Sequence, residues 1–414
     1  MTNRRVVITG LGCVSPLAES VETFFEGLCQ ARSGISTIES FDTSQYPVKI
    51  GGEAKGFNIQ KYAGVREGKR MDRFTQMALA SAIQAVSDSG LDFEKEDKHR
   101  ISVIVGTGIG GIKEIEDQHI RLLKKGPRKV SPFCVPKLMG NAASGCISIQ
   151  YGLKGPNLCI VTACASASHA VGEAFWNVLS GRSDVSITGG SEAALTPIGL
   201  ASFCALRSLS TRNDDPTRAS RPFDKDRSGF VLSEGAGVII LEEYEHAKKR
   251  GAPIYAELLG YGATGDAHHI TAPLEDGSGA ADAMRLSLQQ AKLDPTQIDY
   301  LNAHGTSTEL NDAAESLAIK SVFGDHAYSL AVSSTKSSVG HTLGASGALE
   351  LVACCKTIET GVIHPTANLD EVAPDCDPKM DYVPKEARTA DVRYVLSNSL
   401  GFGGHNCSLV IGKV

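Results

Sequence analysis

The chain has 414 residues, of which 42% are hydrophobic and 21% are charged, a composition typical of a globular protein with core for roughly two or three domains. Its 41 basic and 47 acidic residues give a formal net charge of -6, which argues against a general nucleic-acid binder. No apolar stretch approaches the ~20 residues of a membrane span, and the N-terminus resembles neither a signal peptide nor a transit segment. We expect a cytoplasmic protein or the mature form of an organellar one.

Short apolar runs alternate with helical patterns along the whole chain. Runs that are apolar on both faces, placed between helices, indicate sheets covered by helices and therefore an α/β fold. In chain order the predicted strands are RRVVITG, ISVIVGTG, NLCIVTA, VSITGG, GVIILEE, IDYLNAHG, LAVSSTK, RYVLSNS and CSLVIG.

The chain also repeats itself loosely. Residues 4–25 and 298–319 both read as strand, small-residue loop and helix, and residues 160–175 and 331–351 share that plan. FVLSEGAGVIILEE and YVLSNSLGFGGHNCSLVIG resemble matching hairpins late in each half. We predict two similar halves, residues 1–251 and 252–414, divided after the charged stretch EEYEHAKKRG.

Cys164 stands where an apolar run, residues 158–162, stops and a helical pattern begins at Ser166, with Gly181 as the helix stop. Unpaired N–H groups and the helix dipole favour a thiolate at such a position. A lone cysteine there is more often a packing residue than a nucleophile, so other residues must support a catalytic role. The remaining ten cysteines include no CxxC pair, and we interpret most as reduced core residues.

Two histidines and a lysine follow predicted strands in the second half. His304 precedes a Gly/Thr/Ser loop, and by itself fits a structural role as well as a functional one. Lys336 and His341 lie in a loop of small residues, and Glu350 lies in the mostly apolar helix that follows. A counter-ion such as Lys336 would reduce the cost of burying that carboxylate. Asp312 and Glu315 read as first-turn acids of the helix after His304, where the dipole favours them.

Two glycine-rich segments remain. Phe402 lies between glycines at a predicted hairpin bend, which permits close backbone approach and movement of the ring. GTGIGG, residues 106–111, resembles a phosphate loop, but no acidic residue follows at the spacing of a dinucleotide site. An NAD-dependent oxidoreductase is therefore a weak alternative. His268 and His269 lack partners at metal-binding spacing.

VTACASASHA, NAHGTST, SSTKSSVGH and GFGGHN occur in this order and together resemble the β-ketoacyl-[acyl carrier protein] synthases, most closely the type II elongating enzymes of fatty acid synthesis. The resemblance extends over essentially the whole chain, including SRPFDKDRSGFVLSEGAGVIILEE. It implies the thiolase fold, in which two similar α/β halves form a five-layer αβαβα sandwich, usually as a homodimer.

The resemblance also implies an acyltransferase that condenses malonyl-[acyl carrier protein] with an acyl chain held on Cys164, releasing CO2 and 3-oxoacyl-[acyl carrier protein]. His304 and His341 would stabilise the enolate, with Lys336 as an electrostatic organiser and Glu350 as its partner. Backbone N–H groups of Cys164 and Phe402 would form the oxyanion hole. No cofactor is expected, because phosphopantetheine arrives on the carrier protein.

Further positions match family features. Phe402 resembles the gate and Thr271 the loop that moves with it, Ile109 lines the acyl tunnel, and Thr306 and Thr308 hold pantetheine. Leu400 and His405 depart from the family's phenylalanine and threonine, which puts chain-length preference in doubt. The expected carrier-protein contacts are Lys69, Arg70, Arg128, Lys129 and Arg207, and a structural monovalent cation is expected at Asn302, Glu350, Ser397 and Asn398.

Several alternatives stay open at this point. A degradative thiolase or an initiating synthase would act on coenzyme A esters, but the initiating synthases use Cys-His-Asn, whereas SSVGH supplies a second histidine here. A chain-length-factor-like partner subunit would usually lack the nucleophile. A ketosynthase of the same class could also serve a polyketide or a specialised lipid.

Overall fold

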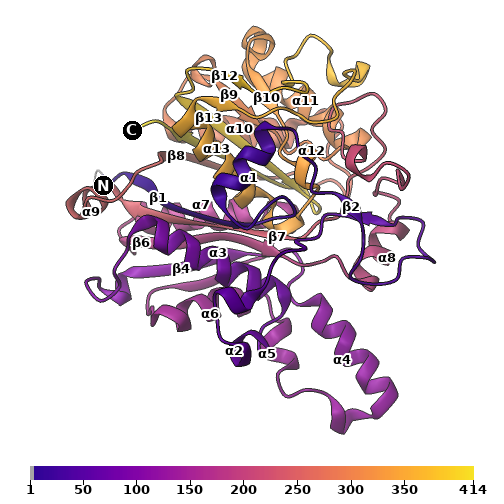
Figure 1. Cartoon of the computed structure of the whole chain (residues 1–414). Helices are drawn as coiled ribbons and strands as arrows, with labels where there is room; N and C mark the ends of the chain where they lie inside the picture. Colours follow the sequence, from indigo (N-terminus) through magenta and orange to yellow (C-terminus); the bar gives the residue numbers. More distant parts are fainter. Residues whose placement is uncertain (1–3) are drawn as a thin grey trace.

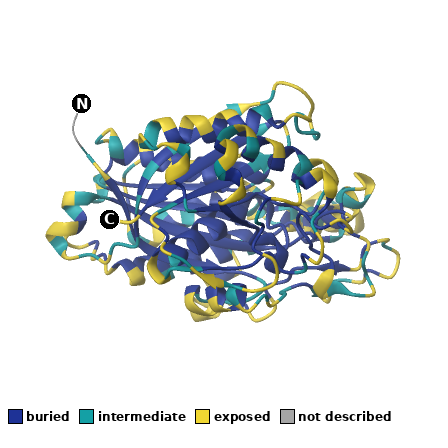
Figure 2. Ribbon diagram, turned by 90° about the horizontal axis from the view of Figure 1, so that it is seen from above, coloured by how far each residue is buried: buried dark blue, intermediate teal, exposed yellow. Residues whose placement is uncertain are grey.

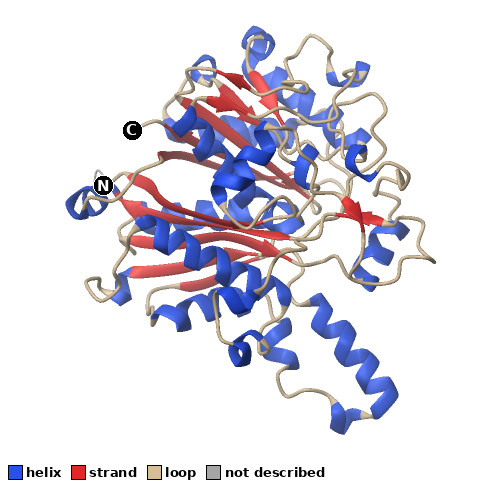
Figure 3. Ribbon diagram, in the orientation of Figure 1, coloured by secondary structure: helices blue, strands red, loops and turns tan. Residues whose placement is uncertain are grey.

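The computed structural model describes residues 4–414 as one ten-stranded mixed sheet with helices around it (Figures 1 and 3). The strands of this sheet are β1 (Val6–Val14), β4 (Ile101–Gly106), β5 (Asn157–Ile160), β6 (Val185–Glu192), β7 (Gly235–Glu243), β8 (Ala256–Gly265), β9 (Tyr300–Asn302), β10 (Ala331–Ser333), β13 (Tyr394–Gly401) and β14 (His405–Gly412). Two short ribbons pair β2 (Ser36–Thr37) with β3 (Ile50–Gly51) and β11 (Val362–Ile363) with β12 (Arg388–Thr389).

The helices vary from one turn to several turns in length. They are α1 (Val21–Cys29), α2 (Val65–Gly68), α3 (Arg73–Ser89), α4 (Ile112–Lys125), α5 (Cys134–Leu138), α6 (Ala142–Tyr151), α7 (Ser166–Leu179), α8 (Pro197–Ala205), α9 (Tyr244–Arg250), α10 (Ser278–Ala291), α11 (Glu309–Phe323), α12 (Lys336–Val339) and α13 (Ser346–Thr360). None of the helices within residues 4–414 is long and apolar enough to cross a membrane.

The sheet repeats one strand order in its two halves. From the outer edges inward, β5-β4-β6-β7-β1 and β10-β9-β13-β14-β8 each follow the same sequence of third, second, fourth, fifth and first strand. The halves meet where β1 pairs antiparallel with β8, with Val6 opposite Leu258 and Ile8 opposite Ala256. The predicted duplication is therefore confirmed, whereas the boundary at residue 251 stays a prediction.

The helices form three layers around the two halves of the sheet. α3 and α6 pack on the outer face of the first half, and α10 packs with α11 on that of the second. Between the halves, α7 contacts β4 and β6, while α13 contacts both β7 and β13. The predicted αβαβα arrangement is confirmed, with its buried centre in the α7–α13 layer (Figure 2).

Paired glycines on the first strand of each half let a helix backbone pack directly on the sheet. A Cβ at Gly260 or Gly262 of β8 would lie 2.1 or 2.0 Å from a carbonyl oxygen of α10. In β1, a Cβ at Gly12 would lie 2.0 Å from the Ser81 carbonyl oxygen of α3. Such glycines lower the apparent hydrophobicity of a strand, and the sequence patterns do not reveal β8 for this reason.

Two expectations about strands are wrong. β5 was expected to be buried, but Leu158 is 46% exposed, because β5 is an edge strand with no further strand beside it in the described chain. The segment before β7 does not form a hairpin with it. Phe230 and Leu232 instead bridge to Leu209 and His341, so this segment joins elements around the pocket described below.

The molecule has two distinct ends. Arg4 and Val414, the first and last described residues, lie near the N and C labels on one side of the sheet, and α8 lies on the opposite side (Figure 1). α4 projects from the body beyond α5 (Figure 1). All eleven cysteines are free thiols and six of them are buried, as expected for reduced core residues.

Candidate active site

Cys164 lies in a tight 3₁₀ turn, Ala163–Ala165, between β5 and α7. Ala163 adopts a positive φ of 50°, an unfavourable conformation for alanine that turns the chain sharply into the helix. α7 begins at Ser166 and is followed by Gly181 at φ 76°, as the sequence predicts. The turn therefore presents the Cys164 side chain at the start of a buried helix.

The predicted thiolate is wrong. The Cys164 residue is only 7% exposed, and this burial raises the pKa of its thiol to about 12. The Lys336 charge and the Phe402 backbone N–H, which donates to the sulfur, act in the opposite direction. Desolvation outweighs both, so the resting group is a thiol, and it must lose its proton during acyl transfer.

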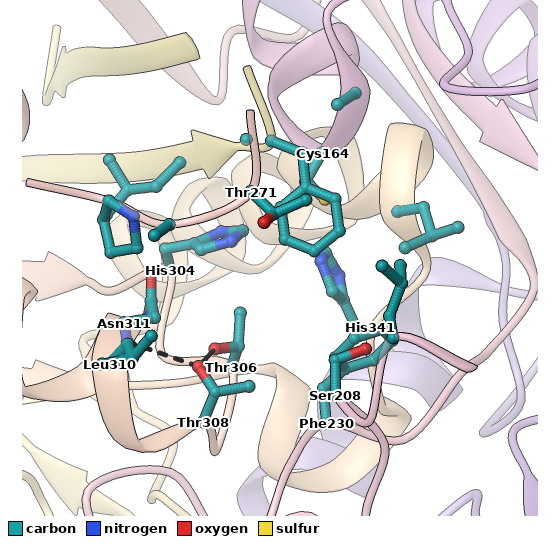
Figure 4. A pocket seen from close by; sticks show the side chains of 18 of the residues that line it. Cys164, Ser208, Phe230, Thr271, His304, Thr306, Thr308, Leu310, Asn311 and His341 are labelled. Atoms are coloured by element: carbon teal, nitrogen blue, oxygen red, sulfur yellow. Dashed lines mark hydrogen bonds between the residues drawn. The ribbon is translucent and has the colours of Figure 1, made fainter. Parts of the chain in front are cut away.

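His304 and His341 line the same cavity as Cys164 although they come from different loops (Figure 4), and Lys336 contacts His304. The two imidazole rings lie nearly perpendicular, at 83°, with centroids 5.3 Å apart. Lys336 Nζ lies 3.1 Å from His304 Nδ1 and also forms a buried ion pair with Glu350. The structure thus brings together the predicted catalytic groups and the predicted counter-ion.

The hydrogen bonds indicate which ring nitrogen of each imidazole carries the proton. An ammonium group can only donate, so Nδ1 of His304 accepts and its proton is on Nε2. The Ser346 hydroxyl lies 3.0 Å from Nδ1 of His341 and can donate to it in the same way. Burial and the Lys336 charge lower the pKa of both histidines well below the usual value. Two neutral rings can therefore each offer an Nε2–H donor.

Asp312 and Glu315 support the loop that carries His304. Glu315 Oε1 and Oε2 each accept a 2.8 Å hydrogen bond, from the backbone N–H groups of His304 and Gly305 respectively. Asp312 accepts from the backbone N–H of Thr306 at 3.0 Å. Both carboxylates are fully buried, and only Asp312 lies in the first turn of α11. The first-turn prediction is therefore confirmed for Asp312 and wrong for Glu315, and loop N–H groups are hydrogen-bond partners of both carboxylates.

The cavity has a volume of about 550 Å³, and its walls include residues of α8, of the loop before α10 and of the start of α11. Sequence patterns do not reveal Phe203 in α8, Phe230 in an isolated bridge or Asp266 in a loop, because nothing in their local sequence marks a pocket. The predicted substrate residues Ile109, Thr271, Thr306, Thr308 and Leu400 all line it, together with Cys164, His304, His341 and Phe402.

The Phe402 loop is tied to the loop that carries Thr271. Gly403 N–H donates to the Ile270 carbonyl at 2.7 Å, and Asp266 N–H donates to the Gly404 carbonyl at 2.9 Å. Asn406 Nδ2 donates to Asp266 at 2.6 Å. A movement of Phe402 must therefore change contacts in both loops.

His405, the departure from the family pattern, lies outside the cavity wall. It is not among the residues that line the cavity, and its ring lies 6.3 Å from that of His169. His169 Nδ1 contacts the Thr162 hydroxyl at 2.7 Å. A direct catalytic part for His405 has no geometric basis.

Three of the four positions expected to hold a cation carry buried oxygens without a partner among residues 4–414. They are Asn302 Oδ1, Glu350 Oε2 and Ser397 Oγ. The fourth differs, because Asn398 Oδ1 already accepts from Ser408 at 2.7 Å and its amide donates to Glu315. Buried oxygens of this kind fit a hard monovalent cation, with Asn398 outside the side-chain ligand set. The described chain contains no cluster of three or more His, Cys, Asp or Glu residues that could hold a metal ion. His268 and His269 therefore belong to no such cluster.

The expected carrier-protein contacts are all exposed but do not form a single cluster. Arg207 lines the cavity mouth after α8, while Lys69 and Arg70 follow α2. Figure 1 places α8 well apart from α2 and α5. Arg128 and Lys129 lie in the turn after α4, and the Arg70 guanidinium lies 5.3 Å from the Phe133 ring centroid.

Comparison with known proteins decides the family. Residues 3–247 match the Beta-ketoacyl synthase, N-terminal domain, and residues 255–370 match the Beta-ketoacyl synthase, C-terminal domain. The chain belongs to the beta-ketoacyl synthase family. The resemblance carried by the four motifs is confirmed, and the oxidoreductase interpretation of GTGIGG is wrong.

Several relatives are similar over the whole length of this beta-ketoacyl synthase. The 3-oxoacyl-[acyl-carrier-protein] synthase 2 of Synechocystis sp. is 49% identical over 100% of this chain and 99% of the relative. That of Coxiella burnetii is 48% identical over 100% of both. A beta-ketoacyl synthase from Burkholderia phymatum has a TM-score of 0.93 at 37% identity, covering 99% of this chain and 100% of the other.

A solved type II PKS ketosynthase is similar as well. It was determined in complex with its acyl-carrier protein and bound to the hexaketide. Its TM-score is 0.92 at 35% sequence identity, and the match covers 99% of this chain and 100% of the other.

Proposed function

We propose that the protein is an acyltransferase that elongates an acyl chain by decarboxylative condensation with malonyl-[acyl carrier protein], as an enzyme of fatty acid synthesis. The relatives of 48–49% identity are named 3-oxoacyl-[acyl-carrier-protein] synthase 2, which supports this substrate class. The observation that carries the proposal is the convergence of Cys164, His304 and His341 on one cavity.

The first step moves the acyl group onto the enzyme. The Cys164 sulfur attacks the thioester carbonyl of the acyl carrier, the new S–C bond forms, and the pantetheine thiol leaves with a proton. The Phe402 N–H already points at the sulfur, so it lies where a tetrahedral oxyanion would develop. The Thr306 and Thr308 hydroxyls, 2.9 Å apart in the cavity wall, are suited to hydrogen-bond the pantetheine arm.

The second step makes the carbon nucleophile and uses it. The bond between the malonyl carboxylate and its α-carbon breaks, CO2 leaves, and the electron pair forms an enolate at the thioester carbonyl. The Nε2–H groups of His304 and His341 donate to that oxygen. The enolate carbon then attacks the acyl-Cys164 carbonyl, and the Cys164 sulfur leaves and regains a proton.

A structural monovalent cation is a further part of the proposal. The partnerless oxygens of Asn302, Glu350 and Ser397 would hold it beneath the Lys336–Glu350 ion pair. Its positive charge would stabilise Glu350, so its role there is electrostatic.

We also propose that two copies of the chain pair along β5. β5 is an edge strand, and its neighbours α6 and α7 carry exposed apolar side chains beside it. Ile149, Leu158 and Trp176 are 82%, 46% and 44% exposed. Apolar surface next to an open strand edge favours association of this kind. Carrier-protein docking through Arg207 and the other predicted basic residues, and a cytoplasmic location, stay predictions.

The test uses purified protein, malonyl-[acyl carrier protein] and acyl carriers of graded length, with products resolved by mass. We expect 3-oxoacyl carriers two carbons longer than each accepted substrate, and none from Cys164→Ala. Product formation by Cys164→Ala would show that Cys164 is not the nucleophile. Acceptance of diketide or longer polyketide carriers in preference to saturated chains would instead favour a ketosynthase of polyketide synthesis, the activity of the similar type II PKS enzyme.

A further inference from the structure

The glycine loop GTGIGG binds an anion, but the anion belongs to the protein. Glu192, the last residue of β6, is fully buried, and its carboxylate accepts hydrogen bonds from both segments beside it. The backbone N–H groups of Gly108, Ile109 and Gly110 donate to it at 2.6, 3.2 and 3.4 Å. The Thr107 hydroxyl donates at 3.0 Å, and the Gly344 N–H donates from the other half of the chain at 3.1 Å.

This arrangement needs the ionised form of Glu192. Burial is the largest influence and raises the pKa of the carboxyl above its usual value, and the N–H donors and the Thr107 hydroxyl offset only part of this rise. Both oxygens are used, since Oε1 accepts from Thr107 and Ile109 while Oε2 accepts from Gly108 and Gly344. The approach is close, because a Cβ at Gly108 or at Gly344 would lie 2.7 Å from Oε2.

Gly344 corresponds to Cys164 in the duplicated fold. The 3₁₀ turn Ala163–Ala165 precedes α7 as the turn Leu343–Ala345 precedes α13. Both turns begin with a residue of positive φ, 50° at Ala163 and 46° at Leu343. The middle residue is Cys164 in one turn and Gly344 in the other.

Each turn is faced by the last residue of the fourth strand of the other half, and this residue differs between the two turns. Glu192 ends the fourth strand of the first half, and Gly401 ends the fourth strand of the second. A Cβ at Gly401 would lie 3.2 Å from the Cys164 backbone nitrogen, so a side chain there would meet the catalytic turn. Glycine leaves that N–H to a substrate oxyanion, while Glu192 fills the equivalent place beside Gly344.

The two segments that Glu192 joins also form the cavity wall. Ile109 and Leu343 line the pocket together with Cys164, and the carboxylate holds the backbone N–H of Ile109 and that of Gly344, the residue after Leu343. We infer that Glu192 is a positioning residue: its carboxylate occupies the noncatalytic copy of the anion-binding turn, holds Ile109 and Leu343 in place, and thereby sets which acyl chains the pocket accepts. This inference rests on the proposed condensing activity.

The test compares wild type with Glu192→Gln, measuring kcat/KM for a short and a long acyl carrier. Glutamine places an NH2 group against backbone donors, so one of the two segments must move. We expect the long-to-short ratio of kcat/KM to change by about ten-fold, the discrimination that a change of one methylene gives in an apolar pocket. An equal fall at every length, or no change, overturns the inference. Wild type that forms no product overturns the proposed function instead.

Matched variants separate positioning from general damage. Glu242→Gln changes an equally buried carboxylate at the opposite end of the β6–β7 pair, and it should keep the wild-type ratio. If Glu192→Gln does not fold, Thr107→Val removes a single donor, and Thr188→Val removes a buried hydroxyl of β6 that has no partner in the described chain. Only Thr107→Val should change the ratio, and equal ratios for both variants contradict the inference.

A second readout reports the charge itself. The negative charge of Glu192 raises the pKa of Cys164, so Glu192→Gln should shift alkylation of that thiol by iodoacetamide to lower pH. A merely structural role would not move this profile in that direction. An unshifted profile would show that no ionised carboxylate stands beside the nucleophile.

Discussion

The turn at Cys164 and the turn at Leu343–Ala345 share a backbone and differ in what faces them. Both are 3₁₀ turns that lead into a central helix, yet one carries a sulfur nucleophile and the other a glycine. A carboxylate on a neighbouring strand fills the second, while Gly401 leaves the first open. One duplicated scaffold thus supplies two anion-binding turns, and the strand-end residue decides which one meets substrate.

The largest expected effects concern groups at the open turn. Cys164→Gln should abolish condensation but retain malonyl decarboxylation, because His304 and His341 remain. Adding His341→Ala to that variant should lower CO2 release by about 100–1000-fold, the usual effect of losing one oxyanion donor. Radiolabelled CO2 release measures this, and unchanged release would remove His341 from the enolate site.

Glu315 and Glu192 hold the loops that follow the second strand of each half, β9 and β4. Replacing each glutamate by glutamine therefore compares the effect of the two loops on catalysis. Glu315 holds the backbone of His304, whose position affects every substrate equally. We expect Glu315→Gln to lower kcat by about 10–100-fold at all acyl lengths, as small misplacements of catalytic groups do. A change confined to long chains would mean that Glu315, too, acts on the acyl pocket.

Away from the turns, the two halves should respond alike. Gly12→Ala and Gly262→Ala each place a Cβ 2.0 Å from a helix carbonyl, so each should destabilise the fold by about 1–3 kcal/mol. Gly145→Ala, in a helix with open space around it, serves as the control and should be neutral or slightly stabilising. Chemical denaturation measures all three, and a large difference between the first two would argue against equivalent packing.

The smallest effect lies at the far end of β7, in the charged cluster of His246 with Glu242 and Glu96. Hydrogen bonds to Glu242 and then Glu96 raise the pKa of His246 to about 9, above the ~6.5 of an unfolded histidine. The stability that this adds is complete below pH ~6.5 and is lost as pH rises through about 9. We expect His246→Gln to remove about 1 kcal/mol of that dependence, allowing for solvent screening. Identical urea unfolding profiles across this range would contradict it.

The sequence predicts the duplicated fold well, because apolar runs and small-residue loops leave local patterns. It also reveals Cys164, His304, Lys336 and His341, since four ordered motifs are specific. It does not reveal β8, because the glycines of this strand are required by close packing against α10, which is distant in sequence. Neither does it predict the neutral thiol, which depends on burial by segments distant in the chain.

Glu192 shows the same limit from the other side. It follows a predicted strand of small and apolar residues, and a lone acid there was the available signal. Its partners are mainly backbone N–H groups, those of residues 108–110 and of Gly344. Every residue type except proline has such a group, so a sequence pattern cannot predict them. The likeness of GTGIGG to a phosphate loop is a weak indication of a nucleotide, yet the N–H groups of this loop do hold a carboxylate, that of Glu192.

The start of β1 and the C-terminal residue Val414 lie on the side of the sheet opposite α8, whose residues help to line the cavity (Figure 1). A tag, a surface tether or a fused carrier attached at either end would therefore leave the entrance unobstructed. Immobilised preparations oriented in this way would keep every mouth facing the bulk solution, ready to meet a diffusing partner.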